Sequence, residues 1–227
     1  MTLLQITTSA PLDSAVVVPG GEAITLFSLL LKGGYMMIPI ILLSIVAVYV
    51  FVERILTIRR ASVPPDGFME KIKRLVYEGD IKGARLICAQ NETPIARMIE
   101  KGVSRIGSPL KNIEVSIENV GKVEIYKLER NLSLLAMISG AAPMIGFLGT
   151  VTGMIRAFIA IAQEEGAVSP KLLSAGIYEA MMTTAAGLLV GIVAYLGYNY
   201  LVTRVQKVVH NMEYTSIDFI DLLQEPR

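Results

Sequence analysis

Two ionisable side chains stand inside long apolar stretches, where a charge is costly to bury. Glu179 is the only acid in the range 172–202, and Arg156 is the only charge in the range 132–162. A carboxyl group in such a segment marks a candidate functional site, with proton binding as the first chemistry to consider. We favour a functional role for Glu179; the alternative is a local ion pair with Arg156, which lies at a comparable depth.

Two hydroxyl groups lie deeper in the same stretches. Counted from the short turn at 163–171, Thr150 and Thr184 are each about 10–15 Å along their segments, at 1.5 Å per residue of helix. Two hydroxyls at one depth can line a polar path. Each can equally bond a carbonyl of its own helix and have no further role. The spacing leaves both interpretations open.

The rest of the sequence offers little reactive chemistry. It has one cysteine, Cys88, and one histidine, His210, so no intrachain disulfide or Cys/His metal cluster is available. No phosphate loop, nucleophile–base set or paired carboxylate motif appears. We predict that the protein is not an enzyme and has no metal or cofactor. Its net charge of +1 gives no argument for nucleic-acid binding.

Three apolar segments have to position the candidate residues. The chain is 53% hydrophobic and 18% charged, whereas soluble domains carry about 25% charged residues. A helix needs about 20 apolar residues to cross a bilayer. The sequence predicts an all-α integral membrane protein with transmembrane helices at 33–53, 132–162 and 172–203. The second and third are long and extend into a helical cytoplasmic domain.

The distribution of lysine and arginine predicts the orientation. Of 21 such residues, 18 lie either between the first two spans, at 54–131, or in the tail at 204–227. Because positive loops face the cytoplasm, both segments are predicted to be cytoplasmic and the N-terminus to lie outside the cell membrane. The turn at 163–171 is then external. Residues 1–32 are expected to form an external arm that ends in an interfacial amphipathic helix or an irregular lead.

The insert at 54–131 is expected to be helical throughout. Asp80 and Thr93 are predicted N-caps, the second strengthened by Pro94 in the first turn. From Lys111 the apolar pattern runs into the second span without a breaker, which predicts one helix of about 50 residues.

The second and third spans carry matching stripes of small residues. Helices in lipid gain little from hydrophobic association, so tight packing relies on small and polar residues. The stripes predict antiparallel helices that approach backbone to backbone and leave room at their seam for a helix of another subunit. A packed hairpin with no further role is the alternative. The residues assigned to packing and pore shaping are Pro143, Gly146, Gly149, Gly153, Ala180, Thr183, Gly187 and Gly191.

Two prolines fall inside predicted spans. Pro143 is expected to kink the second span, as a hinge or as a fixed bend, because proline removes one backbone hydrogen bond. Pro39 is expected to impose a fixed bend on the first span.

Two sequence runs strongly resemble the signatures of a known family. The run AAPMIGFLGTVTGM at 141–154 resembles the second-span signature of the ExbB/TolQ/MotA proton-channel family, and IYEAMMTTAAGL at 177–188 resembles its third-span signature. Gly33-Gly34 at the start of the first span and Glu53-Arg54 at its end also fit. The resemblance covers residues 22–210. Three spans and a modest insert favour the ExbB/TolQ branch.

The resemblance implies a homopentamer in the inner membrane of a Gram-negative bacterium. Its second and third spans would surround an ExbD/TolR-type single-span partner that supplies an essential aspartate. Proton flow would drive motion passed to a TonB- or TolA-like protein. By matched position, Thr150 and Thr184 line the proton path, Glu179 is the third-span acid and Pro143 the second-span proline. Arg156 departs from the family pattern, where an uncharged polar residue is usual.

The coupling ion implied is the proton, with sodium left open. Two other functions remain open: a structural membrane scaffold, and a self-sufficient ion channel or transporter.

Overall fold

A computed structural model of the chain describes residues 33–62, 67–163 and 170–224. These ranges contain helices and no strand, in agreement with the predicted all-α class. The predicted arm and interfacial helix at 1–32 lie outside the described residues, as does most of the turn at 163–171. The helices are α2 (Met37–Ala61), α3 (Phe68–Tyr77), α4 (Ile81–Ala89), α5 (Pro94–Val103), α6 (Leu110–Glu129), α7 (Leu132–Gln163) and α8 (Pro170–Gln224).

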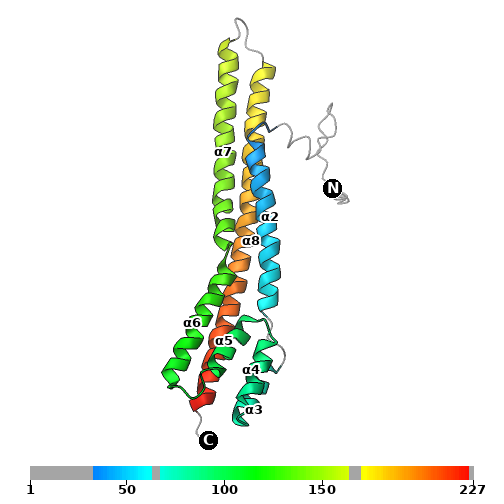
Figure 1. Ribbon diagram of the computed structural model, residues 1–227. Helices are drawn as coiled ribbons and strands as arrows, with labels where there is room; N and C mark the ends of the chain where they lie inside the picture. Colours follow the sequence, from blue (N-terminus) through cyan, green and yellow to red (C-terminus); the bar gives the residue numbers. More distant parts are fainter. Residues whose placement is uncertain (1–32, 63–66, 164–169, 225–227) are drawn as a thin grey trace, which may run out of the picture.

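Three long helices, α2, α7 and α8, lie side by side, with the short helices gathered at one end (Figure 1). Within the described ranges, these three are the helices long and apolar enough to cross a membrane, α7 being counted together with α6. α8 continues without interruption through the predicted tail as one helix of 55 residues. The chain is therefore a multi-pass helical membrane protein with a helical domain, formed by α3 to α6 and the end of α8.

The two predicted N-caps are confirmed, and they explain where the short helices begin. The Asp80 side chain accepts a hydrogen bond from the Gly83 amide at 2.9 Å, which starts α4. The Thr93 hydroxyl accepts one from the Ala96 amide at 3.3 Å, with Pro94 in the first position of α5. Each side chain satisfies an amide that has no partner in the first turn.

The helical domain has its own apolar core around the end of α8. Phe219 is fully buried there, together with Ile99 of α5 and Ile117 of α6. Gly102 of α5 lies so close that an added Cβ would stand 2.6 Å from the Phe219 ring and 2.7 Å from Ile117. Since α8 also forms the third span, this packing ties the domain directly to the membrane helices.

The predicted 50-residue helix from Lys111 into the second span is wrong. The chain breaks at Arg130, which has an extended backbone, and Asn131, which has φ of +66°. Figure 1 shows α6 leaving the line of α7 at this point. Asparagine is among the few residues that tolerate the left-handed conformation, so the chain can break here without a glycine. The apolar pattern of the sequence continues across the break, and it therefore gives no sign of it.

Side chains of α2 stabilise the broken end of α6. The Lys127 carbonyl has lost the helical donor that Asn131 would supply, and Arg54 Nη1 donates to it at 3.0 Å. Arg54 is only 5% exposed and also pairs with Glu53. The Asn131 side chain lies close to the Glu53 carboxylate. The buried arginine therefore acts as a cap from another helix.

The two prolines take different positions in their helices. Pro39 is the third residue of α2, where an amide has no helical acceptor, so the predicted bend in the first span is wrong. α7 runs on as one helix through Pro143, and the kink expected there stays a prediction. The change of direction between the helical domain and the span lies at Asn131.

We expect Asn131→Ala to lower the free energy of unfolding relative to Asn131→Gly by about 1 kcal/mol, the cost of a left-handed backbone for a residue with a Cβ. Both variants lose the asparagine side chain and its interaction with Glu53, so their difference reports on the backbone at this position. Thermal unfolding in detergent measures it, and equal midpoints would contradict the positive φ.

Candidate functional site

The α7–α8 contact brings the two predicted stripes of small residues together. Pro143 lies against Gly191, Gly149 against Thr183, and Gly153 against Ala180. At the centre, Gly146 faces the α8 backbone at Thr183, Thr184 and Gly187. All eight residues assigned to packing from the sequence therefore lie in one continuous seam.

The seam is a backbone-to-backbone contact. A Cβ added at Gly187 would stand 2.6 Å from the Ala142 carbonyl oxygen, and one added at Gly146 would stand 2.8 Å from the Thr183 carbonyl oxygen. Backbone atoms cannot swing aside as the end of a side chain can, so these two positions require glycine. Such close approach gives the helices the dispersion contacts on which association in lipid depends.

The expectation that this seam leaves room for another subunit's helix is wrong for the single chain. The small residues of α7 already pack against those of α8 and leave no space between the two helices. Ala142, Ala180 and Thr183 are buried in this contact. A further helix has to pack on the exposed flanks of the hairpin. These flanks carry large apolar side chains, among them Met144, Phe147, Val151, Met181 and Leu188.

The two predicted hydroxyls lie at one edge of the seam, beside the Gly146 backbone. The Thr184 hydroxyl crosses to the Gly146 carbonyl oxygen at 3.0 Å. Thr150, one turn after Gly146 on the same face, donates to the Phe147 carbonyl oxygen of its own helix at 2.6 Å. Both are partly exposed, and they do not hydrogen-bond each other. The fully buried hydroxyl of the seam is that of Thr183.

The acid and the arginine meet further along the hairpin. Arg156 Nη2 of α7 lies 3.1 Å from Glu179 Oε1 of α8, so the two form an ion pair. The Glu179 side chain is 27% exposed and that of Arg156 47% exposed. Partial exposure keeps the desolvation cost of such a pair small and also makes it weak.

The segment before α2 completes this cluster. The Arg156 guanidinium stands over the Tyr35 ring, 4.7 Å from its centroid. Glu179 packs directly on Gly34, where any Cβ would overlap the carboxylate and where φ is +68°. All three long helices are thus joined at the end far from the helical domain.

Chemistry outside the spans is limited in the described residues. No group of three or more His, Cys, Asp and Glu side chains is placed to hold a metal ion there. Burial, with a smaller contribution from Glu100, raises the pKa of the Cys88 thiol to about 12. At neutral pH this cysteine is a neutral packing residue rather than a nucleophile.

Comparison with known families decides the identity of the hairpin. Residues 90–214 match the model of the MotA/TolQ/ExbB proton channel family, more than half of the chain. The chain belongs to this family. The matched range covers the seam, both predicted hydroxyls and the Arg156–Glu179 pair.

Similar proteins indicate the branch of the MotA/TolQ/ExbB family. The chain is 31% identical to the putative biopolymer transport protein ExbB-like 1 of Synechocystis sp. over 76% of this chain and 69% of that protein. It is 33% identical to ExbB of Aquifex aeolicus over 61% of this chain and 88% of that protein. It is 38% identical to TolQ of Haemophilus influenzae over 37% of this chain and 39% of that protein. The chain therefore belongs to the ExbB/TolQ branch of this family.

Sequence reasoning missed two parts of the site. Gly34 and Tyr35 precede α2, and nothing in their spacing says that they meet Glu179. The role of Arg54 at the end of α6 was also missed. The charged pair Glu53-Arg54 at the end of an apolar segment was the available signal.

We expect Gly187→Ala to destabilise the protein by about 1–3 kcal/mol, as overpacking does, because its Cβ meets the Ala142 backbone. Gly140→Ala, on the same hairpin with open space around it, is the matched control and should leave stability unchanged or raised. Unfolding of the detergent-solubilised protein measures both. Equal effects would show that the seam is not tight.

A double-mutant cycle with Arg156→Gln and Glu179→Gln should give a coupling free energy of about 0.5–1 kcal/mol, as is typical for a partly exposed ion pair. The free energy of unfolding in mixed detergent is the readout. A coupling of zero would mean that the two charges act independently.

Proposed function

We propose that this chain is the wall subunit of a proton-driven motor in a bacterial inner membrane. It forms a homopentamer, surrounds a single-span ExbD/TolR-type partner and passes motion to a TonB- or TolA-like protein. Its N-terminus is periplasmic and its C-terminus cytoplasmic. Membership of the ExbB/TolQ branch supports this proposal.

One observation carries the proposal. In the ranges 132–162 and 172–202 Glu179 is the only acid, and its carboxylate is engaged by Arg156. Deeper in the hairpin the polar side chains beside Gly146 are hydroxyls, which cannot release a proton at physiological pH. A proton path at this depth therefore requires a carboxyl group from a second chain.

The flank that carries Thr150 and Thr184 is the place for such a chain. On α8, Val190 lies about 120° around the helix from Thr184, at 3.6 residues per turn. Val190 faces α2 across a cavity, so α2 covers a different side of α8. Beside Thr150 and Thr184 stand Phe147 and Leu188, 65% and 47% exposed. An apolar helix carrying one acid fits there.

Energetics agree with a motor of this kind. Moving one charge through a membrane potential of 100 mV supplies about 2.3 kcal/mol. A few protons are enough for a modest mechanical step. The proton, rather than sodium, is proposed as the coupling ion because the second and third spans hold no carboxylate besides Glu179 that would help to coordinate a cation.

A structural membrane scaffold is the second candidate, and the closed α7–α8 seam favours it. The two candidates differ in proton flux. Reconstituted with an ExbD-type partner, the chain should pass protons, while the chain alone should pass few. Equal flux from both preparations would point to a self-sufficient channel, and no flux from either would point to a scaffold.

We expect Thr184→Ala to lower the partner-dependent flux by about tenfold, equivalent to roughly 1.4 kcal/mol for the loss of one hydroxyl along the path. Thr184→Ser keeps the hydroxyl and should retain most of the flux. Flux is followed with a pH-sensitive dye in vesicles at matched protein content. Full flux from Thr184→Ala would remove Thr184 from the path.

A further inference from the structure

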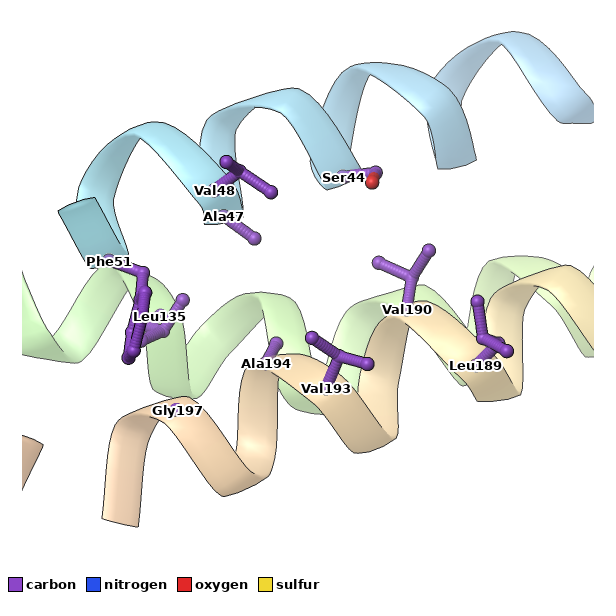
Figure 2. Close-up of a pocket in the computed structure, with 10 residues that line it drawn as sticks. All are labelled: Ser44, Ala47, Val48, Phe51, Leu135, Leu189, Val190, Val193, Ala194 and Gly197. Atoms are coloured by element: carbon purple, nitrogen blue, oxygen red, sulfur yellow. The ribbon is translucent and has the colours of Figure 1, made fainter. Parts of the chain in front are cut away.

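A groove runs between α2 and α8 on the side away from the predicted hydroxyls. Its upper part is a cavity of about 340 Å³, within the range of about 300–1,000 Å³ usual for small-molecule sites. Figure 2 shows Ala47 and Val48 of α2 facing Val190 and Val193 of α8 across it. Apart from the Ser44 hydroxyl, the side chains that line it are apolar. Val48 and Val193 are 58% and 61% exposed, so the cavity opens to the surroundings of the helices.

A second cavity of about 340 Å³ follows on the same line toward the helical domain. Between the two, Phe51 of α2 packs on Gly197 of α8. On each helix the lining residues of the two cavities follow one another at steps of three and four, so both cavities lie on one face. The second cavity is lined by Ile55, Ile58, Arg59, Ser62, Tyr200, Leu201 and Arg204.

The character of the groove changes along its length. Its apolar part lies in the membrane-crossing segments, and the second cavity adds two arginines, Arg59 and Arg204, at the end of the first span. The rise from Phe51 to Arg59 is about 12 Å, at 1.5 Å per residue. That distance takes the groove from the acyl region of one leaflet to its headgroup region, since the hydrocarbon core is about 30 Å thick in all.

The arginines at this end are arranged to bind an anion. The Arg204 Nε donates to the Tyr200 hydroxyl at 3.1 Å, and its guanidinium lies 5.1 Å from the Tyr200 ring centroid, which holds it in place. The Tyr200 hydroxyl accepts this bond, so its own proton remains available to donate. Within the described ranges, neither Arg59 nor Arg204 forms an ion pair with a carboxylate. In the part of the chain that the structure describes, two guanidinium groups and a hydroxyl therefore share one cavity with no carboxylate paired to either guanidinium.

We propose that the α2–α8 groove binds one anionic phospholipid of the leaflet next to the helical domain. Its phosphate contacts Arg59, Arg204 and the Tyr200 hydroxyl, and an acyl chain passes Phe51 into the upper cavity. Water does not fill an apolar cavity inside a bilayer, so a lipid chain is the occupant that matches its lining. Basic pockets between membrane helices recognise anionic headgroups in the same way. The inference requires only that α2 and α8 cross the membrane and is independent of proton conduction.

The test uses the full-length protein in the oligomer it forms, titrated in detergent with phosphatidylglycerol or with phosphatidylethanolamine of the same acyl chains. Native mass spectrometry counts bound lipids per chain. The variant Arg59→Gln/Arg204→Gln removes both charges from the groove. Arg60→Gln, on the same exposed stretch of α2 but outside the cavity lining, is the matched control.

Phosphatidylglycerol should bind at one molecule per chain and raise the thermal midpoint. Arg59→Gln/Arg204→Gln should weaken binding by about 25-fold, since each basic residue near the headgroups contributes about fivefold. Arg60→Gln should bind as the wild type does, and Val193→Trp, which fills the upper cavity, should also lose the lipid while keeping both arginines.

Three results would overturn the proposal. Unchanged phosphatidylglycerol binding by Arg59→Gln/Arg204→Gln would mean that the charges have no role. Equal retention of phosphatidylethanolamine would mean that the groove is unselective. Absence of any bound lipid, together with cross-linking of Val193→Cys to a second copy, would assign the groove to a neighbouring subunit.

Discussion

The close approach of α7 to α8 fixes the positions of the Thr184 hydroxyl and of the Arg156–Glu179 pair. Glycine at Gly146 and Gly187 lets two backbones meet without side chains between them. Only at this separation does the Thr184 hydroxyl reach the Gly146 carbonyl and the Glu179 carboxylate reach Arg156. Water is absent from the bilayer core, so dispersion and these few polar contacts replace the hydrophobic force that holds soluble helices together.

Much of the fold follows from local rules that the sequence displays directly. Apolar length indicates the three spans, and the Asp80 and Thr93 side chains mark helix starts because each satisfies an unpaired amide. The break at Asn131 is different in kind. Asparagine fits an amphipathic helix well enough, and the turn is stabilised by Arg54 and Glu53 of α2, which are distant in the sequence. Tertiary contacts of this type leave no periodic signature.

The candidate site also has features that the sequence predicts and features that depend on tertiary packing. Counting residues from the turn puts Thr150 level with Thr184, and Arg156 level with Glu179, because antiparallel helices share one rise per residue. Such a count does not give the angular orientation of each helix about its own axis. That orientation is what brings the small residues of α7 and α8 into contact and places Thr150 and Thr184 at the edge of the contact. The approach of Gly34 and Tyr35 to the ion pair depends on how α2 is laid across the hairpin.

α8 is a single helix of 55 residues, about 82 Å long at 1.5 Å per residue. An unbroken ladder of backbone hydrogen bonds makes such a rod stiff, whereas the α6–α7 connection has a joint. A twist or tilt imposed on Glu179 would therefore arrive at Phe219, in the core of the helical domain, with little loss. The helical domain therefore moves with α8 as a rigid body. The break at Asn131 between α6 and α7 accommodates the change in angle.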